Sequence, residues 1–169
     1  MSPRRAGRRG DWRPSDAGVT MIEIMTTLLL GSILMAAAVW TFTRYTASQE
    51  QSATADDVSS TLRYAGQRAV AEEITYCVRF DPPAGTWRTY RYACSGGSAV
   101  QVDRGAVRGS RTSLTAASFV APAGGTSADV LFTPRGTASD GFVDVVRSGT
   151  SSRYRISVEG LTARVAASR

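Results

Sequence analysis

Hydrophobic and polar positions divide the chain into an unbroken apolar segment and a longer region in which the two kinds of residue alternate. From Ile24 to Thr43 there are 20 consecutive residues without a charge. As an α-helix this segment would be about 30 Å long, the thickness of the hydrocarbon core of a bilayer. A buried helix of a soluble domain is the alternative, but such a helix rarely runs so far without a charge. The pattern predicts a transmembrane helix that ends at Arg44 and Tyr45, whose side chains suit the membrane interface.

The helical pattern continues beyond the apolar segment. There is no proline between Pro14 and Pro82, so one helix can extend from about Thr20 to Glu72. In its second half, apolar residues recur at spacings of three and four, at Ala55, Val58, Leu62, Ala65 and Ala69. These positions form one stripe along a helix, and we expect the stripe to lie on a β-sheet. A short coiled-coil seam is the alternative.

From Ile74 onward the period changes from helical spacing to alternation. Ile74–Phe80 and Trp87–Ala93 read as two strands of a hairpin joined by a turn at Asp81–Gly85. Further short strands are predicted at Ala99–Val102, Ser118–Ala121, Val130–Thr133, Phe142–Arg147, Tyr154–Val158 and Leu161–Ala166. The fold class is therefore α+β, with a long N-terminal transmembrane α-helix continuing into a C-terminal antiparallel β-sheet region. We divide the chain into a basic leader (1–18), a membrane helix (19–43), an amphipathic extension (44–72) and a β-rich region (73–169).

Composition narrows the range of functions. The chain has no histidine, which removes Ser-His-Asp and Cys-His nucleophilic sites and most zinc sites. The neighbouring acids Asp56-Asp57 and Glu72-Glu73 would point apart on a helix, so they read as surface charges. We expect neither an enzyme nor a bound metal or cofactor.

Half of the net charge of +6 lies within residues 1–18, which hold five arginines against two aspartates. Basic residues before a membrane helix keep that end in the cytoplasm, so the β-rich region is expected outside it. A cleaved secretory signal is a competing interpretation, because Ala36–Ala38 resembles its cleavage site. The apolar segment, however, runs straight through these alanines.

The two cysteines fall on opposite arms of the predicted hairpin. If each residue i pairs with residue 171 − i, Phe80 faces Arg91 and Cys77 lies directly opposite Cys94. This separation suits a disulfide, and an extracytoplasmic location favours one. Two free buried thiols are the alternative.

The residues before the apolar segment resemble a known processing site. Gly18-Val19-Thr20-Met21-Ile22-Glu23 is similar to the prepilin site of type IV pilins and type II secretion pseudopilins. The resemblance implies cleavage by a prepilin peptidase after Gly18 and N-methylation of Val19. It also implies that Glu23 attracts the new amine of an adjacent subunit during assembly. The implied partners are other pilin or pseudopilin subunits, an inner-membrane assembly platform and membrane lipid.

A second resemblance covers the rest of the chain. Leu62–Ala69, the element Phe132-Thr-Pro134-Arg-Gly136 and the segment Tyr154–Gly160 are similar to the GspH/FimT branch, although Gly66 stands where that branch has an arginine. The resemblance implies a minor pilin or pseudopilin that is assembled into a type IV pilus or a type II secretion-like filament. Such a subunit begins as a single-pass protein of the cytoplasmic membrane and ends in an extracellular filament.

Two other functions remain open at this stage. Some FimT-type minor pilins bind DNA for natural transformation through arginines near the C-terminus, and the candidates here are Arg153, Arg155, Arg164 and Arg169. The same arginines can equally be scattered charges on strand faces. An ordinary single-pass protein with an accidental match at Gly18–Glu23 is the third interpretation.

Overall fold

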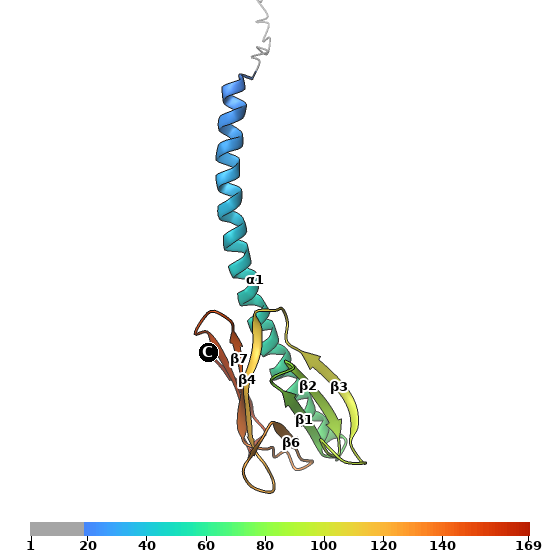
Figure 1. The fold of residues 1–169 in the computed structure, drawn as a ribbon. Helices are drawn as coiled ribbons and strands as arrows, with labels where there is room; N and C mark the ends of the chain where they lie inside the picture. The colour runs from blue at the N-terminus through green and yellow to red at the C-terminus, as the bar shows by residue number, and fades with distance from the viewer. Residues whose placement is uncertain (1–18) are drawn as a thin grey trace, which may run out of the picture. The chain divides into compact units, whose positions relative to one another are not determined.

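A computed structural model describes residues 19–169, in which a single long helix precedes nine strands (Figure 1). The helix α1 (Met21–Ala71) begins and ends within one residue of the predicted bounds. The described residues form two compact units that divide between Thr41 and Phe42. We call the second unit, Phe42–Arg169, the head. It contains the C-terminal part of α1 together with every strand.

The strands of the head form two antiparallel sheets. The first has the order β3-β2-β1-β6 and the second the order β5-β4-β7-β8-β9. Their bounds are β1 (Tyr76–Asp81), β2 (Thr86–Arg91), β3 (Val100–Ala106), β4 (Thr112–Val120), β5 (Thr126–Ser127), β6 (Asp129–Phe132), β7 (Gly141–Arg147), β8 (Arg153–Val158) and β9 (Val165–Ser168). The predicted α+β fold with antiparallel sheets is confirmed.

The apolar stripe of α1 lies in the core of the head. Ala55, Val58, Leu62, Ala65 and Ala69 are each at most 3% exposed. They belong to one cluster with side chains from both sheets, including Phe80 and Phe132 of the first and Val143 and Ile156 of the second. The prediction that the stripe packs on a sheet is confirmed, and the coiled-coil alternative is wrong.

The predicted register of the first hairpin is wrong by four residues. β1 pairs with β2 so that Phe80 faces Trp87 instead of Arg91. The reason is a tight turn, because Gly85 donates a hydrogen bond to the carbonyl of Pro82 at 3.1 Å. Gly85 has a φ of 62°, a conformation that glycine adopts without strain, and the return strand therefore begins at Thr86.

Two strands of the second sheet also differ from their predicted bounds. β4 begins at Thr112, six residues before the predicted start. The sequence pattern did not reveal this part of the strand because it is rich in Ser, Thr and Ala, and because a register shift between Leu114 and Ala116 breaks the alternation of buried and exposed positions. β9 begins only at Val165, because Glu159 donates to the carbonyl of Arg164 and closes a turn over the predicted start.

The end of α1 is joined to the first hairpin by a small polar cluster. The Tyr76 hydroxyl donates to the Glu72 carboxylate at 2.8 Å, and Arg91 donates both to the Tyr76 oxygen and to Glu72. Arg68, one helical turn earlier, lies 3.4 Å from the same carboxylate. The hydrogen bond from Tyr76, and then the charges of Arg91 and Arg68, lower the pKa of Glu72.

Because the folded state lowers the pKa of Glu72, this carboxylate stabilises the head above its ordinary pKa of 4.5 and loses that contribution as the pH falls through the lowered value. We expect Glu72→Gln to unfold at a lower urea concentration than wild type at neutral pH, with the difference shrinking in acid. Urea titrations at a series of pH values would measure it. Glu73→Gln removes the same charge from the neighbouring exposed residue and serves as the control. A constant difference between Glu72→Gln and wild type at every pH would contradict the prediction.

Candidate functional site

The residues that the sequence analysis assigned to processing and assembly lie where α1 begins. The backbone N–H of Glu23 donates to the carbonyl of Thr20 at 3.0 Å and to its hydroxyl at 3.3 Å. Thr20 and Glu23 thus have the spacing of a capping box, which defines the first turn of a helix. Val19 is 66% exposed. Gly18 lies outside the described residues, so only the mature side of the predicted cleavage site is seen.

The carboxylate of Glu23 has no basic partner within 4.0 Å among residues 19–169. A carboxylate without a partner is costly next to an apolar medium. Within one copy of the described residues, no basic group therefore neutralises the charge of the Glu23 carboxylate.

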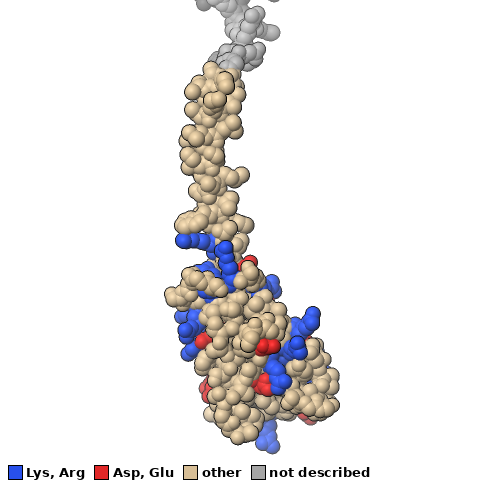
Figure 2. All heavy atoms as spheres, in the orientation of Figure 1, with Lys and Arg blue, Asp and Glu red and all other residues tan. Residues whose placement is uncertain are grey.

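The apolar part of α1 presents hydrophobic side chains on every face. Its large residues from Ile24 to Phe42 are 49% to 71% exposed, and a stretch of it is long and apolar enough to cross a membrane. On the side drawn in Figure 2, charged atoms gather on the head and are absent from this segment. A helix that is apolar all round needs an apolar environment, either lipid or other helices.

The disulfide that the sequence analysis favoured is present between Cys77 and Cys94, with the Cα atoms 5.4 Å apart. Cys77 is in β1, but Cys94 is not opposite it in β2. The chain leaves β2 at Arg91, and Tyr92 takes a φ of 71°, which turns Cys94 back toward β1. The pairing is as predicted although the register that suggested it is wrong.

Asp129 lies beside this disulfide, with a carboxylate oxygen within 4.8 Å of both sulfur atoms. A Cys-Cys-Asp group can be a metal site only when its sulfurs are thiolates. Here they are bonded to one another, and the carboxylate accepts two 2.8 Å hydrogen bonds from Arg79. These bonds raise the pKa of Arg79 and give Asp129 a structural partner.

The four arginines proposed for DNA binding do not form one surface site. Arg155 makes two hydrogen bonds of 2.9 Å to Asp144, which is 4% exposed, and Arg153 lies 3.6 Å from the same carboxylate. The bonds to Asp144 raise the pKa of Arg155. Arg169 lies over the Tyr154 ring at 5.6 Å, while Arg164 lines a separate groove. Arg153, Arg155 and Arg169 make their contacts with residues of β7 and β8 in the second sheet. The DNA-binding alternative is not supported.

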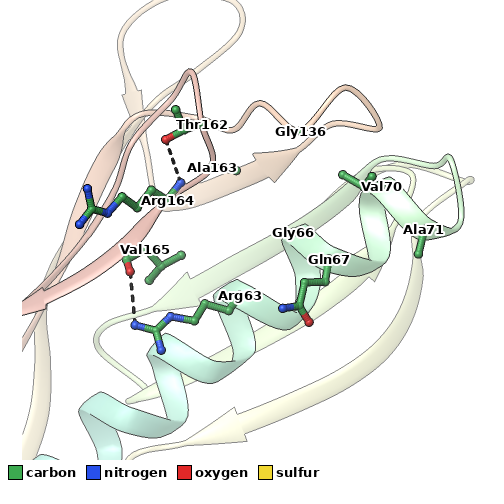
Figure 3. Close-up of a pocket in the computed structure, with 10 residues that line it drawn as sticks. All are labelled: Arg63, Gly66, Gln67, Val70, Ala71, Gly136, Thr162, Ala163, Arg164 and Val165. Carbon is green, nitrogen blue, oxygen red and sulfur yellow. Dashed lines mark hydrogen bonds between the residues drawn. The ribbon is translucent and has the colours of Figure 1, made fainter.

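That groove, of about 590 Å³, runs between α1 and the chain segment that leads into β9 (Figure 3). Arg63 crosses it and donates to the carbonyl of Val165 at 3.3 Å. Three other lining residues have polar side chains, namely Gln67, Thr162 and Arg164. The rest are small or apolar: Gly66, Val70, Ala71, Gly136, Ala163 and Val165. Among these lining residues there is no acid and no nucleophile beside a base.

The family assignment rests on two matches. The family described as type II transport protein GspH matches residues 54–162, which is more than half of the chain. The chain belongs to the GspH family. The prokaryotic N-terminal methylation motif matches residues 13–39, which include Gly18, Val19 and Glu23. No curated protein sequence matches the chain significantly.

Solved structures of pilin-like subunits share the fold. The minor pseudopilin EpsH of the Vibrio cholerae type II secretion system matches with a TM-score of 0.55 and 10% identity, over 70% of this chain and 94% of that one. The type IV minor pilin FimU of Pseudomonas aeruginosa matches with a TM-score of 0.56 and 15% identity, over 74% of this chain and 92% of that one. These likenesses show a shared fold. Membership of the GspH family and the N-terminal methylation motif make the chain a minor pilin or pseudopilin, a class of structural subunits.

The structure explains the one departure from the branch pattern in the helix. A Cβ atom on Gly66 would lie 3.3 Å from the ring of Phe132, so glycine lets this ring pack directly against α1. Phe132 is fully buried, and the turn that follows it places Gly136 at a φ of 76°. Gly66 and the Phe132–Gly136 element, which are far apart in sequence, therefore form one packing unit.

Proposed function

We propose that this GspH-family chain is made as a membrane-anchored precursor, is cut between Gly18 and Val19, and is then built into a filament by its apolar helix. The leader is residues 1–18 and the filament-core helix residues 19–43. Residues 44–72 and 73–169 are the helical extension and the β-rich region of the head. The observation that carries the proposal is the methylation motif at residues 13–39, which overlaps a helix with exposed apolar side chains on every face.

The orientation follows from charge. Five arginines of the leader precede the apolar segment, which favours a cytoplasmic N-terminus and an extracytoplasmic head. A prepilin peptidase removes the leader, and Val19 becomes the methylated N-terminus. The inner-membrane assembly platform then moves the helix from lipid into the filament, where the helices of neighbouring subunits replace lipid as its apolar surroundings. Gly31, Ser32 and Ala36–Ala38 give this helix small surfaces for close packing.

Processing can be tested by intact-mass measurement of the chain purified from membranes that contain a prepilin peptidase. We expect loss of residues 1–18, with Val19 as a methylated N-terminus, and we expect Gly18→Phe to remain uncut because a bulky side chain blocks the cleavage position. Gly10→Phe is the matched control within the leader and should be cut normally. A mature chain that begins after Ala38 would establish a secretory signal and overturn the proposal.

A further inference from the structure

The turn between β8 and β9 holds an exposed apolar side chain in a fixed position. Leu161 in this turn is 85% exposed, more than any large hydrophobic residue of α1. The N–H of Glu159 donates to the carbonyl of Arg164 at 2.9 Å, and the Thr162 hydroxyl donates to the Glu159 carboxylate at 2.8 Å. Ala163 has a φ of 50°, a conformation that is costly for an L-residue and that the surrounding contacts must impose. A rigid turn therefore presents Leu161 to the solvent.

This turn lies between two hollows of the head. On one side is the groove of about 590 Å³ described above, whose walls are α1 and Thr162–Val165 (Figure 3). On the other side is a hollow of about 660 Å³ whose lining includes Leu161 itself. Val120, Pro122 and Leu131 give this second hollow an apolar part. The exposed leucine is thus part of a larger apolar surface and is not an isolated surface residue.

The two hollows carry opposite charges. The lining of the groove has Arg63 and Arg164 and no acid, whereas the lining of the second hollow has Asp140 and Glu159 and no base. Arg63 donates to a backbone carbonyl and Glu159 accepts from a hydroxyl, and these neutral partners leave both charges in place. One surface of the head therefore combines an apolar turn, acids beside that turn and an adjoining groove with bases.

A second copy of the same surface complements these features. We propose that two copies of this chain pair through their heads, with Leu161 of each copy inserted into the groove of the other. The turn and the groove are adjacent and share Thr162, so the exchange is reciprocal and closes as a two-fold dimer. The insertion brings Asp140 and Glu159 of one copy toward Arg63 on the α1 wall of the other, where opposite charges attract.

This pairing goes beyond the proposed function, because it needs neither cleavage nor a filament. The membrane anchoring proposed above would favour it, since two heads held at one bilayer have a higher effective concentration for each other.

The oligomeric state of the full-length chain in a non-ionic detergent tests the proposal. Sedimentation equilibrium over a range of protein concentrations would give the dissociation constant of the dimer. We expect wild type to dimerise and Leu161→Ser to weaken the dimer about 100-fold, because each dimer loses the burial of two leucine side chains. The matched control is Val100→Ser, which changes a 51% exposed residue of β3 that lines neither hollow. It should dimerise as wild type does.

Two charge reversals test the arrangement of the copies. Arg63→Glu or Asp140→Arg alone would bring like charges together in both halves of the dimer, so we expect each variant to be largely monomeric. Mixed in equal amounts, the two variants present opposite charges in both halves, and we expect a mixed dimer to form. A dimer held by the apolar segment of α1 would not show this pattern, since neither residue lies in that segment.

A wild-type chain that stays monomeric at every concentration would overturn the proposal, also where it binds a different subunit instead. A dimer that Leu161→Ser leaves intact, an equal loss in Val100→Ser, or a mixture of the charge variants that forms no dimer would overturn it too. If Leu161→Ser does not fold, Leu161→Ala replaces it and should also weaken the dimer. The measurement uses neither peptidase nor filament, so an uncut chain can still dimerise and a monomeric chain can still be cut.

Discussion

Glu23→Leu is expected to abolish incorporation of the processed chain into filaments while leaving membrane insertion and peptidase cleavage intact. In an ordinary membrane anchor the same substitution would be neutral or favourable, because a carboxylate at the edge of the apolar segment costs about 3 kcal/mol if it enters the bilayer unpaired. The direction of the effect therefore separates a filament subunit from a simple anchor.

The position of Glu23 in the first turn of α1 is the basis of this expectation. Its carboxylate has no basic partner within 4.0 Å among the described residues, and it lies about one turn from Val19, which carries the free amine if the proposed cleavage takes place. In the apolar core of a filament, this carboxylate would pair with the amine of an adjacent subunit. Removing one partner of a buried pair leaves the other charge without compensation, at a cost of about 3–5 kcal/mol.

The assay is co-purification of the processed chain with sheared filaments that also contain wild-type subunits of the same system. Thr26→Leu is the matched control, because it puts leucine in place of a polar side chain one turn further along the same helix. We expect the control to be incorporated and Glu23→Leu to stay in the membrane fraction. Normal incorporation of Glu23→Leu would mean that this carboxylate is not an assembly contact.

The features predicted correctly from sequence are those that local spacing determines. The absence of proline between Pro14 and Pro82 fixed the extent of α1, and the three-and-four spacing from Ala55 to Ala69 identified its buried face. The first follows from the missing N–H of proline and the second from the period of the helix, and neither needs knowledge of what packs against α1.

The features that sequence did not predict depend on contacts between distant segments. Gln51 is 1% exposed and donates to the carbonyls of Val145 and Ser152, while its own oxygen accepts a bond from the Ser152 hydroxyl. Nothing near Gln51 in sequence distinguishes it from an exposed polar residue on the helix. The groove that Arg63 crosses was missed for the same reason, since its two walls are formed by segments that are far apart in the sequence.

The register of the first hairpin was predicted wrongly for a different reason. The alternation from Ile74 identified two strands, but alternation has a period of two and leaves the register open to any even shift. The turn sets the register, and here Pro82 and Gly85 close it more tightly than the sequence pattern indicated. The prediction of the disulfide is nevertheless correct. Cys94 reaches Cys77 from a turn beyond β2, so the pairing of the cysteines does not depend on the register of the hairpin.

Gly141→Ala is expected to be the most damaging small substitution in the head, lowering the free energy of unfolding by about 3 kcal/mol or more. Gly141 begins β7 and lies opposite Phe119 of β4. A Cβ atom there would lie less than 3.0 Å from the backbone of both Ser118 and Phe119, and backbone cannot move aside as a flexible side chain can. Displacing β4 would also disturb Phe119, a fully buried ring that stacks on Phe80 of the other sheet at 5.8 Å.

Urea unfolding of the full-length chain, followed by near-ultraviolet circular dichroism, measures the loss. Gly97→Ala is the matched control, because a Cβ atom on Gly97 would have no neighbour within 4 Å, and we expect a change within about 0.5 kcal/mol. The contrast matters because both substitutions add the same methyl group and reduce the freedom of the unfolded chain equally. A difference between them therefore reports the contact between β4 and β7, and equal midpoints would show that the two strands can separate at Gly141 without cost to the head.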